Sequence, residues 1–223
     1  MHIRTSDQEK LHLGIGDYSC NWGTHICCLY ETEAERDQLL LGYLNRGDRD
    51  GNLQFYCPSE QTHEEFEQKY AHFCPQCASH YRNPDHFSLI APQSFYYPSG
   101  TFSPWEMEKT ITAYVSGTQA RGRRYVRAIA EMAWALQAIP GIDLLMAYES
   151  RLNYLIPGSP VISLCAYNIH KFSGALMMQV LRTHPYTLTG GIITQNPYYL
   201  HPDVWLAKYA PEYLSPAPQG NVR

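Results

Sequence analysis

The chain has 223 residues, enough for one large α/β domain and too few for two of ordinary size. Hydrophobic residues make up 44% and charged residues 17%, a balance that excludes an intrinsically disordered chain. The formal net charge of −4 argues against direct nucleic-acid binding, which usually needs a basic face. We therefore expect one domain over residues 1–223, with a core from about 14 to 205 and a tail over 206–223.

Segments typical of buried strands alternate with helical segments, which predicts an α/β fold with a mostly parallel sheet flanked by helices. The expected strands are His25–Tyr30, Leu53–Cys57, Phe87–Ala91, Tyr125–Ala130, Val161–Tyr167, Tyr186–Thr189 and a last one at Ile192–Ile193. The expected helix starts are the capping boxes Thr32–Glu35 and Thr62–Glu65, the first-turn proline Pro104, and Ser173. We expect residues 95–102 to form an exposed loop and residues 215–220 to be frayed.

The chain carries no visible targeting or membrane signal. Its first residues lack the apolar segment and cleavage site of a signal peptide. The longest apolar stretch, residues 132–147, is interrupted by Gln137, Pro140 and Asp143, so we do not expect it to span a bilayer. Seven cysteines without a secretion signal are typical of reduced thiols. The sequence therefore predicts a cytoplasmic protein.

The turn after the first expected strand is where a parallel sheet of this kind usually binds phosphate. Such a turn needs glycines for close backbone approach and a lysine for charge. Here it reads Tyr30–Glu35, with no glycine, no lysine and three carboxylates. Neither of the common glycine-rich phosphate-binding motifs occurs elsewhere in the chain. We therefore expect a degenerate nucleotide site that does not bind ATP.

Five stretches of the sequence resemble the MEDS domain, a sensory-domain family named for methanogens, methylotrophs and the regulator DcmR. They occur in the family's order, and they are Gly23–Glu31, Arg127–Ala135, Tyr148–Asn153, Leu164–Asn168, and His184–Pro185 together with Asn196–Tyr199. The resemblance covers roughly residues 14–205. It implies a fold related to RecA/KaiC-type ATPases from which the phosphate-binding loop has been lost.

Ligands of open α/β sheets bind beyond the C-terminal ends of the strands, so we expect the site between the first and fourth strands. The candidate ligand-binding residues are His25, Tyr30, Glu31, Glu131, Trp134, Tyr167 and Asn168. His25 begins its strand and is included because it lies in a matched stretch. For Trp134 the residue type favours core packing over a wall of the ligand site, whereas a buried Glu131 needs a partner. We expect Glu149 and Arg151 on a solvated helix face and His184 in a turn before proline.

A cysteine-rich segment is a second candidate site. It places two thiols and two imidazoles within nine residues, at His72, Cys74, Cys77 and His80. The Cys-x-x-Cys spacing suits half of a structural zinc site, which would recruit a further ligand such as Cys57 or His63. A redox dithiol and incidental free thiols remain alternatives. Cys27 and Cys28 are not expected to chelate together, because neighbours on a strand point to opposite faces.

The resemblance implies a sensor of small organic compounds, often hydrocarbon derivatives, that acts for transcription factors or histidine kinases. No DNA-binding or kinase module is visible in the sequence, so we expect a signal to a separate regulatory protein or through a homo-oligomer. One alternative is an enzyme that uses the same crevice, with Glu131 or His25 as acid or base, although no nucleophile elbow or paired-carboxylate motif supports it. Another is a metal-stabilised interaction module without a small ligand.

Overall fold

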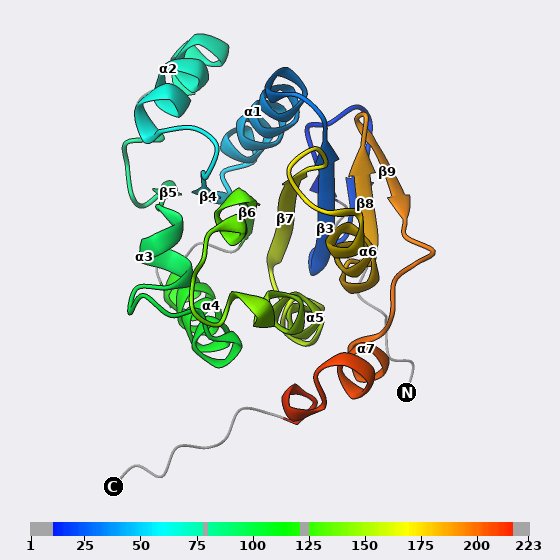
Figure 1. Cartoon of the computed structure of the whole chain (residues 1–223). Helices are drawn as coiled ribbons and strands as arrows, with labels where there is room; N and C mark the ends of the chain where they lie inside the picture. Colours follow the sequence, from blue (N-terminus) through cyan, green and yellow to red (C-terminus); the bar gives the residue numbers. More distant parts are fainter. Residues whose placement is uncertain (1–10, 78–79, 121–124, 216–223) are drawn as a thin grey trace, which may run out of the picture.

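The computed structural model describes residues 11–77, 80–120 and 125–215. Its main sheet has seven strands in the order β5-β4-β6-β7-β3-β8-β9 (Figure 1). Neighbouring strands are parallel except for the pair β8–β9. The strands are β3 (Thr24–Tyr30), β4 (Leu53–Cys57), β5 (Phe87–Leu89), β6 (Val126–Glu131), β7 (Val161–Asn168), β8 (Tyr186–Thr189) and β9 (Ile192–Gln195). The predicted α/β class with a mostly parallel sheet is confirmed.

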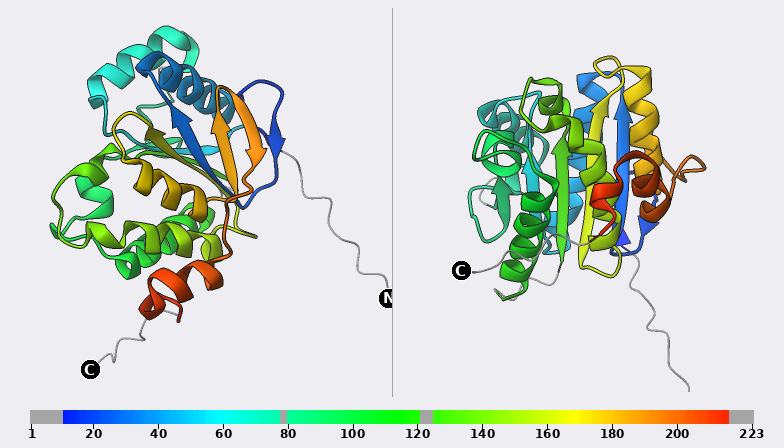
Figure 2. Two further views of the ribbon diagram at one scale, coloured as in Figure 1. Left: turned by 45° about the vertical axis from the view of Figure 1, so that its right-hand side comes forward. Right: turned by 60° about the horizontal axis from the view of Figure 1, so that its bottom comes forward.

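Helices cover both faces of this sheet (Figures 1 and 2). One face packs against α1 (Glu33–Arg49) and α2 (His63–Phe73). The other face packs against α3 (Pro92–Tyr96), α4 (Pro104–Ala120), α5 (Leu145–Leu155) and α6 (Gly174–Thr183). The remaining elements are α7 (Pro202–Tyr209), a small antiparallel pair β1 (Leu11–His12) and β2 (Ser19–Cys20), and 3-10 turns at Pro75–Cys77, Ala133–Leu136, Ile142–Leu144 and Pro211–Tyr213.

The strands are buried on both faces because helices lie on both sides, as in other largely parallel sheets. Successive side chains alternate between the two layers. Cys27 belongs to the core beneath α4 and α5, whereas Cys28 belongs to the core beneath α1 and α2, as expected for strand neighbours. Within the described residues, no helix is long and apolar enough to cross a membrane.

The helix starts follow their capping residues. The hydroxyl of Thr32 accepts a hydrogen bond from the Glu35 backbone N–H at the start of α1. Thr62 and Glu65 form the expected reciprocal capping box at α2. Ser173 caps α6 through the Leu176 N–H. These local signals fix where each helix leaves the sheet edge.

The segment expected to be an exposed loop is instead largely anchored. Residue 96 ends helix α3, and the side chains of Tyr96 and Phe102 are 5% and 1% exposed. Both rings pack on Trp134, with centroid separations of 4.3 Å and 5.7 Å. The Phe102 N–H also donates to the Pro140 carbonyl at 2.8 Å. Burial of these aromatic rings therefore outweighs the turn-forming residues of this segment, and only residues 98–101 of it are exposed.

The packed part of the chain also extends beyond the expected boundary at residue 205. Trp205 and Leu206 of α7 are 4% and 0% exposed, and α7 lies against α5. Arg151 of α5 donates to the Tyr213 carbonyl and lies over the Trp105 ring at 4.2 Å. Leu206 and Ala210 are thus buried in the core, although most of the other side chains of residues 206–213 are exposed. The stretch predicted to be frayed lies outside the described residues from position 216 onward.

The turn at Gly141 provides a test of this anchoring. Gly141 has φ 82°, and a Cβ there would clash with the Phe102 carbonyl oxygen. Gly100 has a similar φ of 84° but open space around it. We expect Gly100→Ala to cost about 1 kcal/mol of unfolding free energy, and Gly141→Ala to cost about 1–3 kcal/mol more because backbone must shift. Urea unfolding of both variants measures the difference, and equal losses would contradict the anchoring.

Candidate functional site

The structure distributes the predicted ligand residues over three places. Tyr30, Glu31, Glu131 and Asn168 lie at the C-terminal edge of the sheet. His25 and Tyr167 belong to a buried polar cluster between β3, β7 and α5. Trp134 lies in the aromatic core beneath α3. Strand β7 separates the first and fourth predicted strands, so the crevice expected between them is filled by a neighbour.

Glu131 is the centre of the contacts at the C-terminal edge. It is 0% exposed, and its carboxylate accepts hydrogen bonds from the Tyr56 hydroxyl at 2.5 Å and from the Ser59 and Glu60 N–H groups at 2.7 Å and 2.6 Å. The Arg36 Nε lies 3.5 Å from the same carboxylate. Glu131 therefore has the partners that a buried charge requires. These hydrogen bonds hold the loop between β4 and α2 in place, and both carboxylate oxygens of Glu131 have partners.

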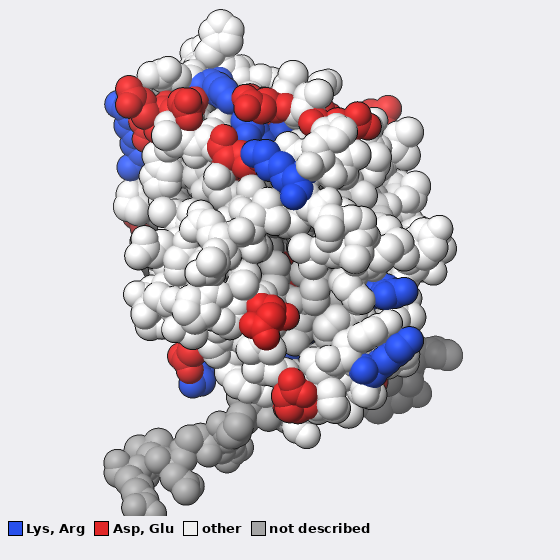
Figure 3. All heavy atoms as spheres, viewed as in Figure 1, with Lys and Arg blue, Asp and Glu red and all other residues white. Residues whose placement is uncertain are grey.

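The other edge residues are engaged in the same way. Tyr30 donates its hydroxyl to Glu60, and Glu60 forms an ion pair with Lys171. The Asn168 side chain accepts from the His170 N–H at 3.1 Å, while Glu31 is exposed. Charged side chains gather over this rim near α1 and α2, and they are sparse over the middle of the same view (Figure 3). The edge is thus a closed network of polar contacts.

The N-terminus of α1 is occupied by groups of the chain itself. The Thr32 hydroxyl accepts from the Glu35 N–H, and the Glu35 carboxylate accepts from the Glu31 N–H at 2.9 Å. These are among the helix-end N–H groups that bind phosphate in nucleotide-binding folds. A triphosphate approaching them would meet carboxylates of like charge.

An apolar cavity of about 330 Å³ lies between the sheet and helices α4 and α5. Its floor comes from β4, β6 and β7, and its sides from α3, α4 and α5. Lining residues include Phe55, Phe95, Tyr96, Ile111, Val115, Ala128, Tyr148, Leu152, Leu155, Val161 and Ser163. Trp134 does not line the cavity, but it stacks on Tyr96 and so supports one wall from behind.

The cavity is electrically neutral. Among the described residues, no Lys, Arg, His, Asp or Glu lines it, and the polar atoms of the lining are hydroxyl groups and backbone. Burial raises the pKa of Tyr96 and of Tyr148 well above the ordinary value, so both phenols stay protonated. An apolar, uncharged concavity of this kind suits a small organic molecule rather than an ion.

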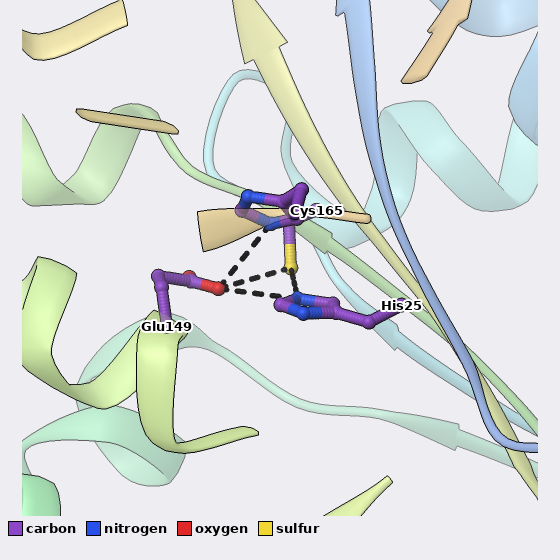
Figure 4. A group of neighbouring side chains, drawn as sticks. His25, Glu149 and Cys165 are labelled. Atoms are coloured by element: carbon purple, nitrogen blue, oxygen red, sulfur yellow. Dashed lines mark hydrogen bonds and ion pairs between the residues drawn. The ribbon is translucent and has the colours of Figure 1, made fainter. Parts of the chain in front are cut away.

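A buried polar cluster lies on the same face of the sheet, next to this cavity. It brings together His25 of β3, Glu149 of α5, Cys165 of β7 and His184 after α6, and these side chains could hold a metal ion (Figure 4). One ligand atom from each residue lies within 4.8 Å of all the others. The four residues are at most 3% exposed. Tyr167 adjoins them, because its hydroxyl donates to Glu149 at 3.4 Å.

Protonation in this cluster follows from burial and from the neighbouring groups. Burial alone would raise the pKa of Glu149, but the neighbouring imidazoles of His184 and His25 outweigh it and lower the pKa to about 2. Burial, reinforced by His184, lowers the pKa of His25 and favours the neutral imidazole. Burial and the Glu149 charge raise the pKa of the Cys165 thiol. The cluster therefore holds an ionised carboxylate beside at least one neutral imidazole.

The cysteine-rich segment differs from its expected role as a metal site. Cys74 and Cys77 form a disulfide, so in this state neither offers a thiolate. His80 pairs instead with Asp48, with 2.8 Å between Nδ1 and Oδ1, and His72 is exposed. The expectation that all cysteines are reduced is also wrong for this pair, whereas Cys20, Cys27, Cys28, Cys57 and Cys165 are free thiols.

Sequence reasoning missed three of the four cluster residues. Glu149 and Arg151, expected on a solvated face, are 0% and 5% exposed because α5 is covered by α7 and the sheet. The proline after His184 points only to a turn, and Cys165 does not stand out within its strand. A usable signal existed, since the four cluster residues lie in four different matched stretches and all of them can ligate metal.

Replacing Glu131 tests whether the edge is structural. In Glu131→Gln the new amide would place its NH₂ group against either the two loop N–H groups or Tyr56, so donors would face donors. We expect Glu131→Gln to lower the unfolding free energy by about 2–4 kcal/mol. The exposed Glu31→Gln is the control and should change it by less than about 0.5 kcal/mol. An unchanged urea midpoint for Glu131→Gln would contradict this role.

Nucleotide binding provides a second test of the edge. Because carboxylates of the chain occupy the start of α1, we expect no magnesium-dependent binding of ATP or GTP in titration calorimetry. Binding in the micromolar range would show that these contacts rearrange and would overturn the account of this edge.

Several known proteins are similar to this chain in sequence or in fold. The chain is 24% identical over 161 residues to the transcriptional repressor DcmR of Methylorubrum extorquens, a match that covers 72% of this chain and 57% of that repressor. The fold is similar to a KaiC-like protein, PH0186, of Pyrococcus horikoshii, with TM-score 0.53 and 12% identity over 81% of this chain and 80% of that one. The flagellar accessory protein FlaH of Methanocaldococcus jannaschii gives TM-score 0.53 and 14% identity, covering 84% and 81%.

These structural likenesses show the fold alone, a RecA/KaiC-like α/β architecture. Similarity in sequence identifies the family. The model of the MEthanogen/methylotroph, DcmR Sensory domain matches residues 24–185, a range that contains the cluster and almost all of the cavity lining. The chain belongs to the MEDS family of sensory domains.

Proposed function

We propose that this protein is a cytoplasmic sensor that binds a small, uncharged and mainly apolar organic molecule in the cavity beneath α4 and α5. The cavity is the main support for this proposal. It has a volume of about 330 Å³, it is lined by aliphatic and aromatic side chains, and none of the described residues that line it is charged. Membership of a sensory-domain family supports a role in detection rather than in catalysis. The edge where RecA-like proteins are expected to bind nucleotide is filled by contacts of the chain itself.

Helix α5 is suited to transmit the binding of a ligand in the cavity to the C-terminal segment of the protein. It lines the cavity through Tyr148, Leu152 and Leu155. Arg151, a neighbour of Tyr148 and Leu155 on the helix surface, contacts Glu108 of α4 and the Tyr213 carbonyl beyond α7. A ligand that changes the spacing of α4 and α5 would therefore move the contacts that hold the C-terminal segment. Such a ligand acts by binding one arrangement of these helices better than another.

We further propose that the signal passes to a separate regulatory protein, either a transcription factor or a kinase. The support is the relationship to a transcriptional repressor, of which this chain matches 57% of the length. The negative net charge is consistent with an indirect role at DNA.

A cavity-filling variant tests the ligand site with benzene as an apolar probe. Ala128 lies on β6 at the cavity floor, so Ala128→Phe adds a ring to the space that a ligand would occupy. Apolar cavities in proteins bind benzene. We expect benzene to raise the melting temperature of the wild type in a dose-dependent manner, and to leave that of Ala128→Phe unchanged.

The matched control is Ala113→Phe, which adds the same ring on the exposed side of α4 away from the cavity. This variant should keep the full response to benzene. Acetate, a small anion, should stabilise none of the three proteins, because the lining offers no cation. Equal benzene responses in Ala128→Phe and the wild type would remove the cavity from consideration as the ligand site.

A further inference from the structure

We propose that His25, Glu149, Cys165 and His184 form a structural site for one divalent transition-metal ion of the zinc class. This site is separate from the ligand cavity and from the cysteine-rich segment. Its four donor atoms have the spacing and the lone-pair directions that such an ion requires.

The spacing of the donor atoms fits a tetrahedral ion. Zinc ligands at about 2.0–2.3 Å from the metal lie roughly 3.3–3.7 Å apart along the edges of a tetrahedron. The Glu149 Oε2 lies 3.2 Å from His25 Nε2, 3.4 Å from His184 Nε2 and 3.7 Å from Cys165 Sγ. The His25 Nε2 to Cys165 Sγ distance is 3.4 Å. Four edges of the tetrahedron are thus already set (Figure 4).

The outer nitrogen of each imidazole has a fixed partner. The Asn153 side-chain NH₂ donates to the backbone carbonyls of Glu149, Ser150 and Thr183, which turns its Oδ1 toward His25 Nδ1 at 3.3 Å. His25 therefore donates its proton outward from Nδ1. The His184 Nδ1 likewise lies 2.8 Å from the Val180 carbonyl oxygen, which can only accept. Outward hydrogen bonds of this kind orient metal-binding histidines and fix their tautomer.

With both protons directed outward, the lone pairs of the two Nε2 atoms point inward at a carboxylate oxygen. His184 Nε2 makes no hydrogen bond within the described structure. Acceptors that face each other in a dry interior are costly unless a cation or a proton lies between them. A divalent cation at the centre of the four atoms supplies the positive charge and turns every acceptor into a ligand. The thiol proton of Cys165 is released when the metal binds.

The donor set selects the class of metal. Two imidazoles, one thiolate and one carboxylate suit zinc and similar borderline-soft ions, whereas calcium and magnesium require oxygen ligands. Four protein ligands complete a tetrahedron, and all of them are buried, so no position stays open for substrate. The role is therefore structural. The ion would link β3, β7, α5 and the junction between α6 and β8, immediately beside the cavity wall at Tyr148.

Elemental analysis of the full-length protein is the first measurement. The protein is produced in zinc-supplemented medium and purified without a histidine tag or chelator. We expect about one equivalent of zinc. Cys165→Ser should reduce zinc content by about tenfold or more, since even the loss of an outer partner typically costs 10–100-fold in affinity. Asn153→Ala, which frees His25 Nδ1, should weaken binding in that 10–100-fold range in a chelator competition.

Two controls separate this site from other thiols. Cys27 is a buried free thiol paired in register with Cys165 on the same face, so Cys27→Ser should retain the metal. The Cys74→Ser/Cys77→Ser double variant should also retain it, because its thiols lie in the other core. After exchange for cobalt, the wild type and both controls should show a thiolate-to-cobalt charge-transfer band that Cys165→Ser lacks.

X-ray absorption at the zinc edge of the wild-type protein gives an answer that depends on no variant. We expect one sulfur at about 2.3 Å and three nitrogen or oxygen ligands at about 2.0–2.1 Å. Two sulfur ligands, with zinc lost in the Cys74→Ser/Cys77→Ser variant, would overturn the proposal in favour of the cysteine-rich segment. Folded wild-type protein that contains no metal and binds no added zinc or cobalt would overturn it outright.

Discussion

Burying a charge without a partner is costly, and Arg127, Glu131 and Glu149 are all buried between the sheet and the helices that cover it. Arg127 is satisfied by Asp50, Asn52 and the carbonyls of residues 12 and 13. Glu131 is satisfied by a hydroxyl and two backbone N–H groups. Glu149 has only imidazoles, a thiol and a phenol around it. That difference explains why one carboxylate closes a loop while the other is suited to a cation.

The closure around Glu131 moves the candidate function from the edge of the sheet to its face. In a nucleotide-binding relative of this fold, the strand ends would be expected to present backbone N–H groups to phosphate. Here those groups are taken by Thr32, Glu35 and Glu131. A cavity remains between β6 and helices α4 and α5, and the described residues that line it carry no charge. The same layered architecture can thus exchange a charged ligand for an apolar one without changing strand order.

The strands and the starts of the capped helices were predictable because each depends on residues that are neighbours in sequence. Cys27 and Cys28 point to opposite faces of the sheet, and Thr62 and Glu65 cap the same helix end. The burial of Glu149 was not predictable, since it depends on α7 covering α5 from residues more than fifty positions away. The neighbours of each strand were not predictable for a similar reason, because strand order is set by packing, and β7 inserts between β3 and β6. The Cys-x-x-Cys spacing allowed metal or disulfide equally.

The proposed ligand site lies on the α4/α5 face and not at the strand ends. A crystal of the protein pressurised with xenon tests it most directly, since xenon enters apolar cavities that stay dry. The account predicts an anomalous peak above Ala128, between β6 and helices α4 and α5. A peak beside Tyr30 and Glu131, or a well-ordered crystal with no xenon in the cavity, would contradict it.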